Sequence, residues 1–146
     1  MAELHPAQLL FTEKHPLTAE FDMTFHSGDD HSLEVRLDAP ASFADQDGIH
    51  VHTGFHTLIL DTVMGACAIG ELKTPVPIAT VKLTSNHLRN IKVGEQVVCR
   101  AEWEDEAHSI AYVRGEIRSA EGNLLASHAV ATFMIGTAGK PLGKKK

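Results

Sequence analysis

Apolar and polar residues alternate along several stretches of the chain, the pattern typical of strands with one buried face. Two early stretches, around residues 21–26 and 33–37, are separated by a Ser-Gly-Asp-Asp turn at 27–30. Later stretches lie at 79–84, 97–104, 110–118 and 124–135. Because these later stretches follow one another closely, we expect them to pair as antiparallel strands.

The alternation also predicts which face each side chain occupies. In the stretch 79–84, one face holds Ala79, Val81 and Leu83, and the other holds Thr80, Lys82 and Thr84. Simple alternation therefore places Thr80 on the polar face, together with Lys82 and Thr84.

One long stretch has no such alternation. From Phe55 to Leu72 nearly every residue is apolar or small, which predicts a helix buried on almost all sides. Pro75 and Pro77 force an extended connection after it. The order of two strands, a long helix and a run of strands predicts an α+β fold, with an antiparallel sheet wrapped around a long central helix.

Two polar features of this helix are unusual for a purely structural element. Asp61 lies in its apolar middle, and His52-Thr53-Gly54 stands at its start, where free backbone N–H groups can bind an anion. A buried aspartate usually has a partner or a task, so a functional role competes with a structural one as a cap for a neighbouring loop. His52, likewise, either contacts substrate or only bonds the backbone at the helix start.

The spacing of His52 and Asp61 has a consequence for assembly. Nine residues at about 100° per residue place the two on opposite sides of one helix. A site that uses both must take one from each of two chains, which requires a dimer.

Size and charge limit the class of protein. The chain has 146 residues and a formal net charge of −6, which favours one domain and argues against nucleic-acid binding. We expect an N-terminal extension or short helix at 1–16, one domain at 17–136 and a disordered basic tail at 137–146. The first residues lack a signal-peptide pattern and no apolar run is long enough for a membrane span, so we expect a cytoplasmic protein. Cys67 and Cys99 are expected to be buried thiols.

The motifs resemble a known family when they are taken in order. His52-Thr53-Gly54 is followed nine residues after the histidine by Asp61, then by Pro77-Ile78-Ala79-Thr80-Val81 and Asn90-Ile91-Lys92-Val93-Gly94-Glu95. This series resembles the hotdog-fold acyl-CoA thioesterases of the phenylacetic-acid-degradation (PaaI) type, within the 4-hydroxybenzoyl-CoA thioesterase-like superfamily. The resemblance covers about residues 20–135.

The resemblance implies a hotdog fold, a homodimer or dimer of dimers, and an acyl-CoA substrate at the subunit interface. It implies that Asp61 is the general base or nucleophile, that the Thr53 and Gly54 amides polarise the thioester carbonyl, and that His52 and Thr80 complete the catalytic group. Two positions depart from the family pattern. Thr53 replaces a glycine, and Gln46 stands at the spacing of an asparagine that contacts substrate; one inserted residue would place Asp45 or Asp47 there instead.

Phe55 and Met64 are candidate walls of the substrate pocket. No cofactor is expected. The helical spacing of His52 and His56, with His50 before them, suggests a metal site, but no third ligand is evident, so we predict none. A non-catalytic acyl-CoA-binding or lipid-binding hotdog protein remains the alternative function. A hydratase is disfavoured because Ala66 stands where that group carries a histidine.

Overall fold

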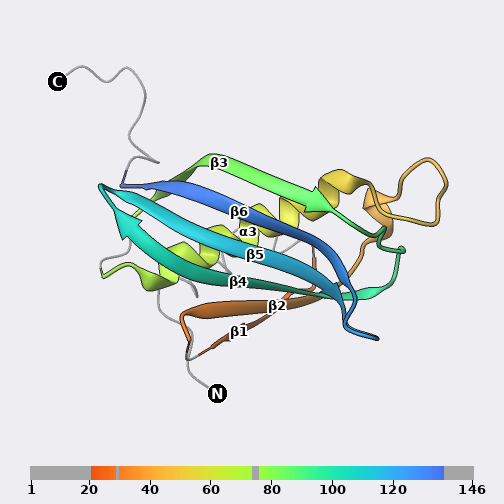
Figure 1. Cartoon of the computed structure of the whole chain (residues 1–146). Coiled ribbons are helices and arrows are strands. Elements are labelled where there is room, and N and C mark those ends of the chain that lie inside the picture. Colours follow the sequence, from red (N-terminus) through yellow and green to blue (C-terminus); the bar gives the residue numbers. More distant parts are fainter. Residues whose placement is uncertain (1–20, 29, 74–75, 137–146) are drawn as a thin grey trace.

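The computed structural model describes residues 21–28, 30–73 and 76–136 (Figure 1). The extension expected at 1–16 and the tail expected at 137–146 lie outside this range. The elements, in chain order, are β1 (Thr24–Ser27), β2 (Ser32–Asp38), the short 3-10 helix η1 (Ala41–Phe43), α3 (Thr53–Glu71), β3 (Ile78–His87), β4 (Gln96–Ala107), β5 (Ile110–Ser119) and β6 (Leu125–Ile135).

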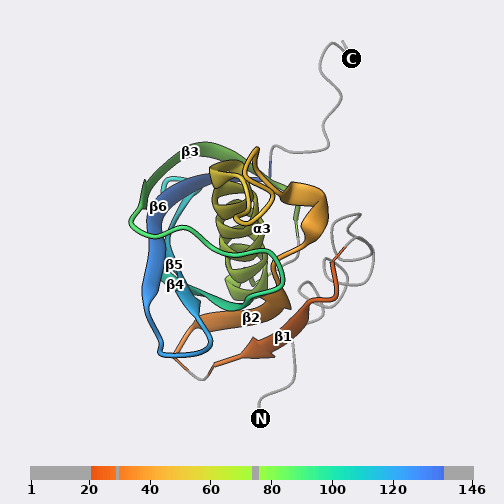
Figure 2. The ribbon, with the colours of Figure 1, turned by 90° about the vertical axis from the view of Figure 1, so that its right-hand side faces the viewer.

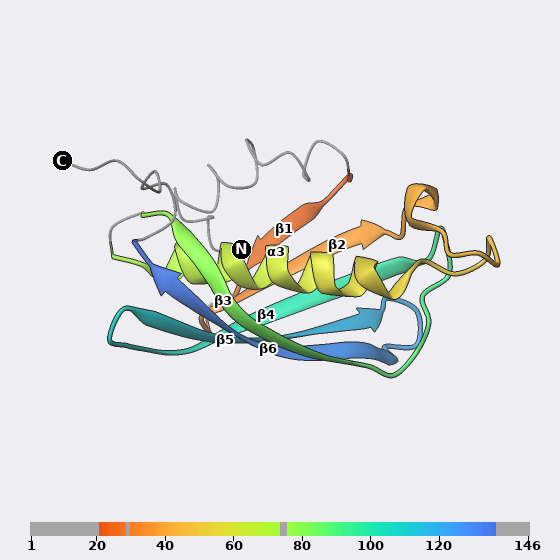
Figure 3. The same cartoon turned by 90° about the horizontal axis from the view of Figure 1, so that it is seen from above.

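All strands belong to one antiparallel sheet in the order β1-β2-β4-β5-β6-β3. The sheet curves around α3, which contacts each strand from β2 to β6 (Figure 2). Seen from above, the helix lies lengthwise along the sheet (Figure 3). The predicted α+β class and the sheet wrapped around a central helix are confirmed, and this arrangement is the one that the hotdog resemblance implies.

The core forms between α3 and the inner face of the sheet. Residues Val97, Cys99, Ala101, Ala111, Val113 and Ile117 are buried there, as the alternation predicts. Gly115 lets the sheet approach α3 closely, because a Cβ atom at this position would lie 3.0 Å from the Met64 Cγ and 3.3 Å from the Leu60 Cδ2. By length and composition α3 could cross a membrane, but most of it is buried against the sheet, so we interpret it as a core helix.

Strand β3 differs from simple alternation because it contains a β-bulge. Its register with β6 shifts between Thr80 and Lys82, so that Thr80 pairs with the buried Phe133 and Lys82 pairs with Thr132. Val81 is the extra residue and is 56% exposed. The prediction that Thr80 shares a face with Lys82 was therefore wrong: one inserted residue reverses the alternation, and Thr80 faces α3.

Two other boundaries differ from the prediction. β1 begins at Thr24, and Phe21 is buried ahead of it, with its ring 5.5 Å from that of Phe43 and 6.2 Å from that of Phe55. The helix begins at Thr53 and is not buried on all sides, because several residues of its first half remain exposed or half-buried.

Candidate active site

Asp61 and Thr80 are brought together by the fold. The Thr80 hydroxyl donates a hydrogen bond of 2.8 Å to the Asp61 Oδ1, which joins the middle of α3 to the start of β3. Asp61 is half-buried and Thr80 is exposed, so the pair lies at the surface of the single chain. The other carboxylate oxygen of Asp61 has no partner among the described residues, and it is free to meet a water molecule or a substrate.

The Asp61 carboxylate lies on a stripe of α3 that the sheet leaves uncovered. Gly54 is exposed, and Thr57, Leu58 and Asp61 are half-buried. Thr57, Leu58 and Asp61 follow Gly54 by three, four and seven positions, which is the spacing of one helix face. The stripe therefore leads from the helix start to the carboxylate along one open side.

The helix start is organised by the His52 side chain. His52 is the N-cap residue, and its Nδ1 accepts a hydrogen bond of 2.9 Å from the Gly54 amide. Through this bond the His52 ring gives the Gly54 amide an acceptor at the helix start. The Thr53 amide has no acceptor among the described residues. Of the two amides expected to polarise a carbonyl, Thr53 is open and Gly54 is already engaged.

The structure does not bring His52 and Asp61 into contact. The ring of His52 bonds the Gly54 amide, whereas Asp61 bonds Thr80 two turns further along the helix. No interaction joins the two side chains within the described chain.

The loop before the helix is held by Asp47. Its Oδ1 accepts hydrogen bonds from the Ile49 and His50 amides at 2.9 and 3.0 Å, and its Oδ2 lies 2.8 Å from the His50 Nδ1. These contacts, led by the His50 amide, lower the pKa of the Asp47 carboxyl to about 2. Gln46 is exposed, and its side chain has no partner among the described residues. Asp47 thus shapes the loop, and Gln46 is left available.

Phe55 and Met64 lie in the core of the single chain. Both are fully buried, and the Phe55 ring packs 5.7 Å from that of Phe43. Met64 fills the space beside Gly115. Their assignment as walls of a substrate pocket stays a prediction.

His56 is a buried polar residue that sequence reasoning treated only as a possible metal ligand. It is 1% exposed, and its Nδ1 lies 3.1 Å from the hydroxyl of Ser127, which is fully buried. Its position four residues before Leu60 and three before Ile59 is the signal that could have placed it on the inner helix face. No group of three metal-ligating side chains occurs in the part of the chain that the structure describes.

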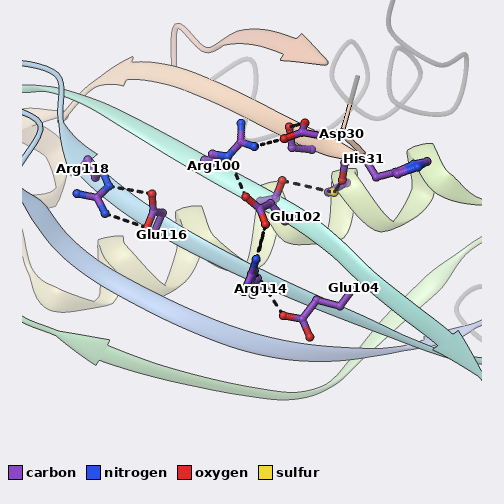
Figure 4. Close-up of polar contacts among 11 residues, drawn as sticks. Asp30, His31, Arg100, Glu102, Glu104, Arg114, Glu116 and Arg118 are labelled. Carbon is purple, nitrogen blue, oxygen red and sulfur yellow. Dashed lines mark hydrogen bonds and ion pairs between the residues drawn. The ribbon is translucent and has the colours of Figure 1, made fainter. Parts of the chain in front are cut away.

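The outer face of the sheet offers a second group of charged residues (Figure 4). A depression of about 220 Å³ is lined by Arg100, Glu102, Arg114, Gly115 and Glu116. Its arginines are paired, however: Arg114 and Arg100 both donate to Glu102, and these bonds hold the pKa of the Glu102 carboxyl below its usual value. Since the charges balance one another on the side of the sheet away from α3, the Asp61 stripe is the stronger candidate for the active site.

Comparison with known proteins agrees with the fold. A sequence profile described as the thioesterase superfamily matches residues 48–126, which include His52, Asp61 and Thr80. Among curated proteins, none matches the sequence.

Three solved structures show the same fold. A phenylacetic acid degradation-related protein from Ralstonia eutropha is 24% identical, with a TM-score of 0.75, and the alignment covers 88% of this chain and 98% of that one. A thioesterase family protein from Silicibacter pomeroyi is 17% identical, with a TM-score of 0.79 and coverage of 89% and 96%. The E. coli PaaI protein from the phenylacetic acid degradation operon is 12% identical, with a TM-score of 0.77 and coverage of 91% and 96%. These neighbours show that the chain has the fold of PaaI-type hotdog proteins.

Proposed function

Because more than half of the chain matches the family profile, the protein belongs to the thioesterase superfamily, and we propose that it hydrolyses acyl-CoA thioesters. The observation that carries this proposal is the hydrogen bond between Thr80 and Asp61 on the open stripe of α3. Thr80 occupies one carboxylate oxygen and leaves the other for the reaction.

The chemistry assigns one role to each residue. With Asp61 as general base, its free oxygen takes a proton from water, the water oxygen bonds the thioester carbon, and the C–S bond then breaks. The proton passes from Asp61 to the departing thiolate. With Asp61 as nucleophile, a carboxylate oxygen bonds the thioester carbon and the C–S bond breaks to release the thiolate; water then cleaves the resulting anhydride, which frees the acid and restores the Asp61 carboxylate, and the thiolate takes up the proton from that water. In either case the Thr53 amide donates to the oxyanion, and charge stabilisation of this kind is often the largest catalytic contribution.

The direct test is thiol release from short, long and aromatic acyl-CoAs, with Asp61→Asn measured beside the wild type. Asp61→Asn keeps the size of the side chain and can still accept from Thr80, but it cannot act as a base or nucleophile. We expect turnover to fall by at least about a hundredfold. Equal turnover by the two proteins would disprove the role of Asp61.

We further propose that the active protein is a homodimer formed at β3, alone or as a dimer of dimers. β3 is an edge strand that pairs only with β6 in the described sheet, and an edge strand can pair with another chain. The open stripe of α3 and the exposed Val81 lie on the two elements that a second copy would cover. The helix start of that second copy, with its His52 and its Thr53 amide, would then face Asp61, in line with the opposite-side placement of His52 and Asp61 on one helix.

Two cations support CoA as the carrier of the acyl group. Arg89 and Lys92 are exposed and have no carboxylate partner among the described residues, unlike the arginines of the outer sheet face. Their segment lies beside the helix start, because the Val51 amide donates to the Ile91 carbonyl at 2.8 Å. CoA carries phosphates that such cations bind.

Both cysteines are free thiols, and we place the enzyme in the cytoplasm.

A non-catalytic acyl-CoA-binding protein is the second candidate. It is favoured by the His52 ring, which occupies the Gly54 amide and leaves one open donor at the helix start. Tight binding of acyl-CoA without turnover across the panel would establish this function instead.

A further inference from the structure

His56 is the one side chain for which a buried nitrogen lacks a hydrogen-bond partner among the described residues. Its Nε2 is buried and unpaired, while its Nδ1 shares a hydrogen bond with the Ser127 hydroxyl. The ring meets the ring of His87 edge-on, with centroids 4.9 Å apart and planes at 90°. His56 therefore links α3 to β6 and lies against the end of β3.

A buried histidine with an unpaired nitrogen stabilises the fold less than an apolar residue of similar size would. Neutral imidazole has one N–H and one lone pair on its ring nitrogens, so either tautomer leaves Nε2 unsatisfied here. A buried polar atom without a partner destabilises the fold, whereas a leucine would fill the same space at no such cost. The residue is thus poorly explained by stability alone.

The position of His56 suggests a role that explains why this destabilising residue is present. It lies three residues after Thr53 and two after Gly54, within the first turns of α3. On the other side, the helix start is held by backbone bonds, from the His52 amide to the Phe43 carbonyl at 2.7 Å and from the Val51 amide to the Ile91 carbonyl. The bond to Ser127 is the side-chain link that anchors the same turns to the sheet.

We propose that His56 is a positioning residue, which holds the Thr53 amide in place for the oxyanion through its hydrogen bond to Ser127. This inference rests on the proposed thioesterase function. An amide that is displaced by an ångström stabilises the transition state poorly, so loss of the bond should lower kcat rather than substrate affinity.

Three substitutions of His56 separate positioning from packing. In His56→Asn the side-chain amide takes the position of the imidazole Nδ1 and can keep the hydrogen bond to Ser127. In His56→Gln the amide takes the position of Nε2, so the hydrogen bond to Ser127 is lost. His56→Leu removes both polar atoms. We expect the Gln and Leu variants to lose about tenfold in kcat, with KM changed less than about twofold, and the Asn variant to stay near the wild type. Ser127→Ala should match Leu in kcat.

Ile59→Val is the matched control, because it removes a buried methyl group from the same helix without touching a polar contact. If kcat in all the variants instead follows their melting temperatures, with the smaller Asn the most impaired, His56 acts by packing and the proposal is overturned.

A second readout does not depend on thioester turnover. Amide hydrogen exchange at Gly54 and Phe55, whose amides donate to the ring and to the carbonyl of His52, should speed up about tenfold in the Gln and Leu variants and remain unchanged in the Asn variant when measured by NMR. Unchanged exchange in all of them would refute the positioning role even in an active enzyme. Failure of the wild type to cleave any acyl-CoA would refute the proposed function, and the exchange rates would still decide whether His56 fixes the helix start.

Discussion

At the scale of single residues, substitutions at the contact between Thr80 and Asp61 test the proposed chemistry most directly. Thr80→Val removes the hydroxyl that donates to the carboxylate and keeps the shape of the side chain. Since a hydrogen bond to a charged group contributes about 1.5–3 kcal/mol, we expect kcat to fall roughly tenfold to a hundredfold. Thr80→Ser keeps the hydroxyl and should retain most of the activity. Equal loss in both variants, measured by thiol release, would contradict a role for the hydroxyl.

His56 makes a prediction about stability and pH. Burial and, to a smaller extent, the nearby His87 lower the pKa of His56 to about 4, whereas the pKa of an unfolded histidine is about 6.5. As the pH falls, the unfolded state therefore binds the proton first. The free energy of unfolding should drop by about 3 kcal/mol between roughly pH 6.5 and pH 4.

Urea titrations of the wild type and of His56→Leu at several pH values test this. The Leu variant should lack the loss in that window. Carboxylates with a lowered pKa, such as Asp47, stop stabilising the folded state only at lower pH, between the ordinary pKa of an aspartate and about 2. The loss of stability caused by His56 therefore occurs at higher pH than the loss caused by these carboxylates. A parallel decline in both proteins above pH 4 would show that another group is responsible.

At the scale of elements, the sequence predicted the regular alternation of the strands and the long apolar helix, but it did not predict the bulge that interrupts the alternation in β3. The buried faces of β4 and β5 follow simple alternation, and α3 follows from its long apolar run. The bulge at Val81 depends on how β3 pairs with β6, a long-range contact that no local pattern encodes. That bulge turns Thr80 towards Asp61, whereas simple alternation placed Thr80 on the opposite face.

The helix start shows the same limit. The sequence identified His52-Thr53-Gly54, but not that the His52 ring would bond the Gly54 amide, because side-chain rotamers depend on the surrounding packing. The alternation could not show that the sheet leaves the Asp61 stripe open, since coverage of a helix depends on sheet curvature.

The connection between β3 and β4 makes a prediction about the carrier. Removing Arg89 and Lys92 together, as R89A/K92A, should raise KM for acyl-CoA about tenfold, because their charges would no longer attract the CoA phosphates. KM for an acyl thioester of N-acetylcysteamine, which has no phosphate, should not change. Arg36→Ala/Arg114→Ala, on the outer face of the sheet, is the charge-matched control away from this segment. An equal rise in KM for both substrates would argue against phosphate binding by these residues.

At the scale of the whole molecule, a curved sheet with an open edge and a half-covered helix predicts that one chain holds only part of the site. Asp61 and Thr80 come from the same chain, as their hydrogen bond shows. Thr53 lies at the far end of the stripe, and we expect its amide to serve the carboxylate of a second copy. Thr53→Pro deletes this one amide with little harm to the helix, because proline is favoured at the first helical position.

Mixing inactive variants tests whether the site is shared. Thr53→Pro and Asp61→Asn should each be nearly inactive as homodimers, but each mixed dimer would contain one intact site of two. Since random exchange makes half of the dimers mixed, the equimolar mixture should regain about a quarter of wild-type activity. Mixing Asp61→Asn with Thr80→Val is the control, because both residues belong to the same half-site and no mixed dimer would be intact. Recovery in neither mixture, with subunit exchange verified by mass spectrometry, would place Thr53 and Asp61 of the same chain in one site and rule out the shared site.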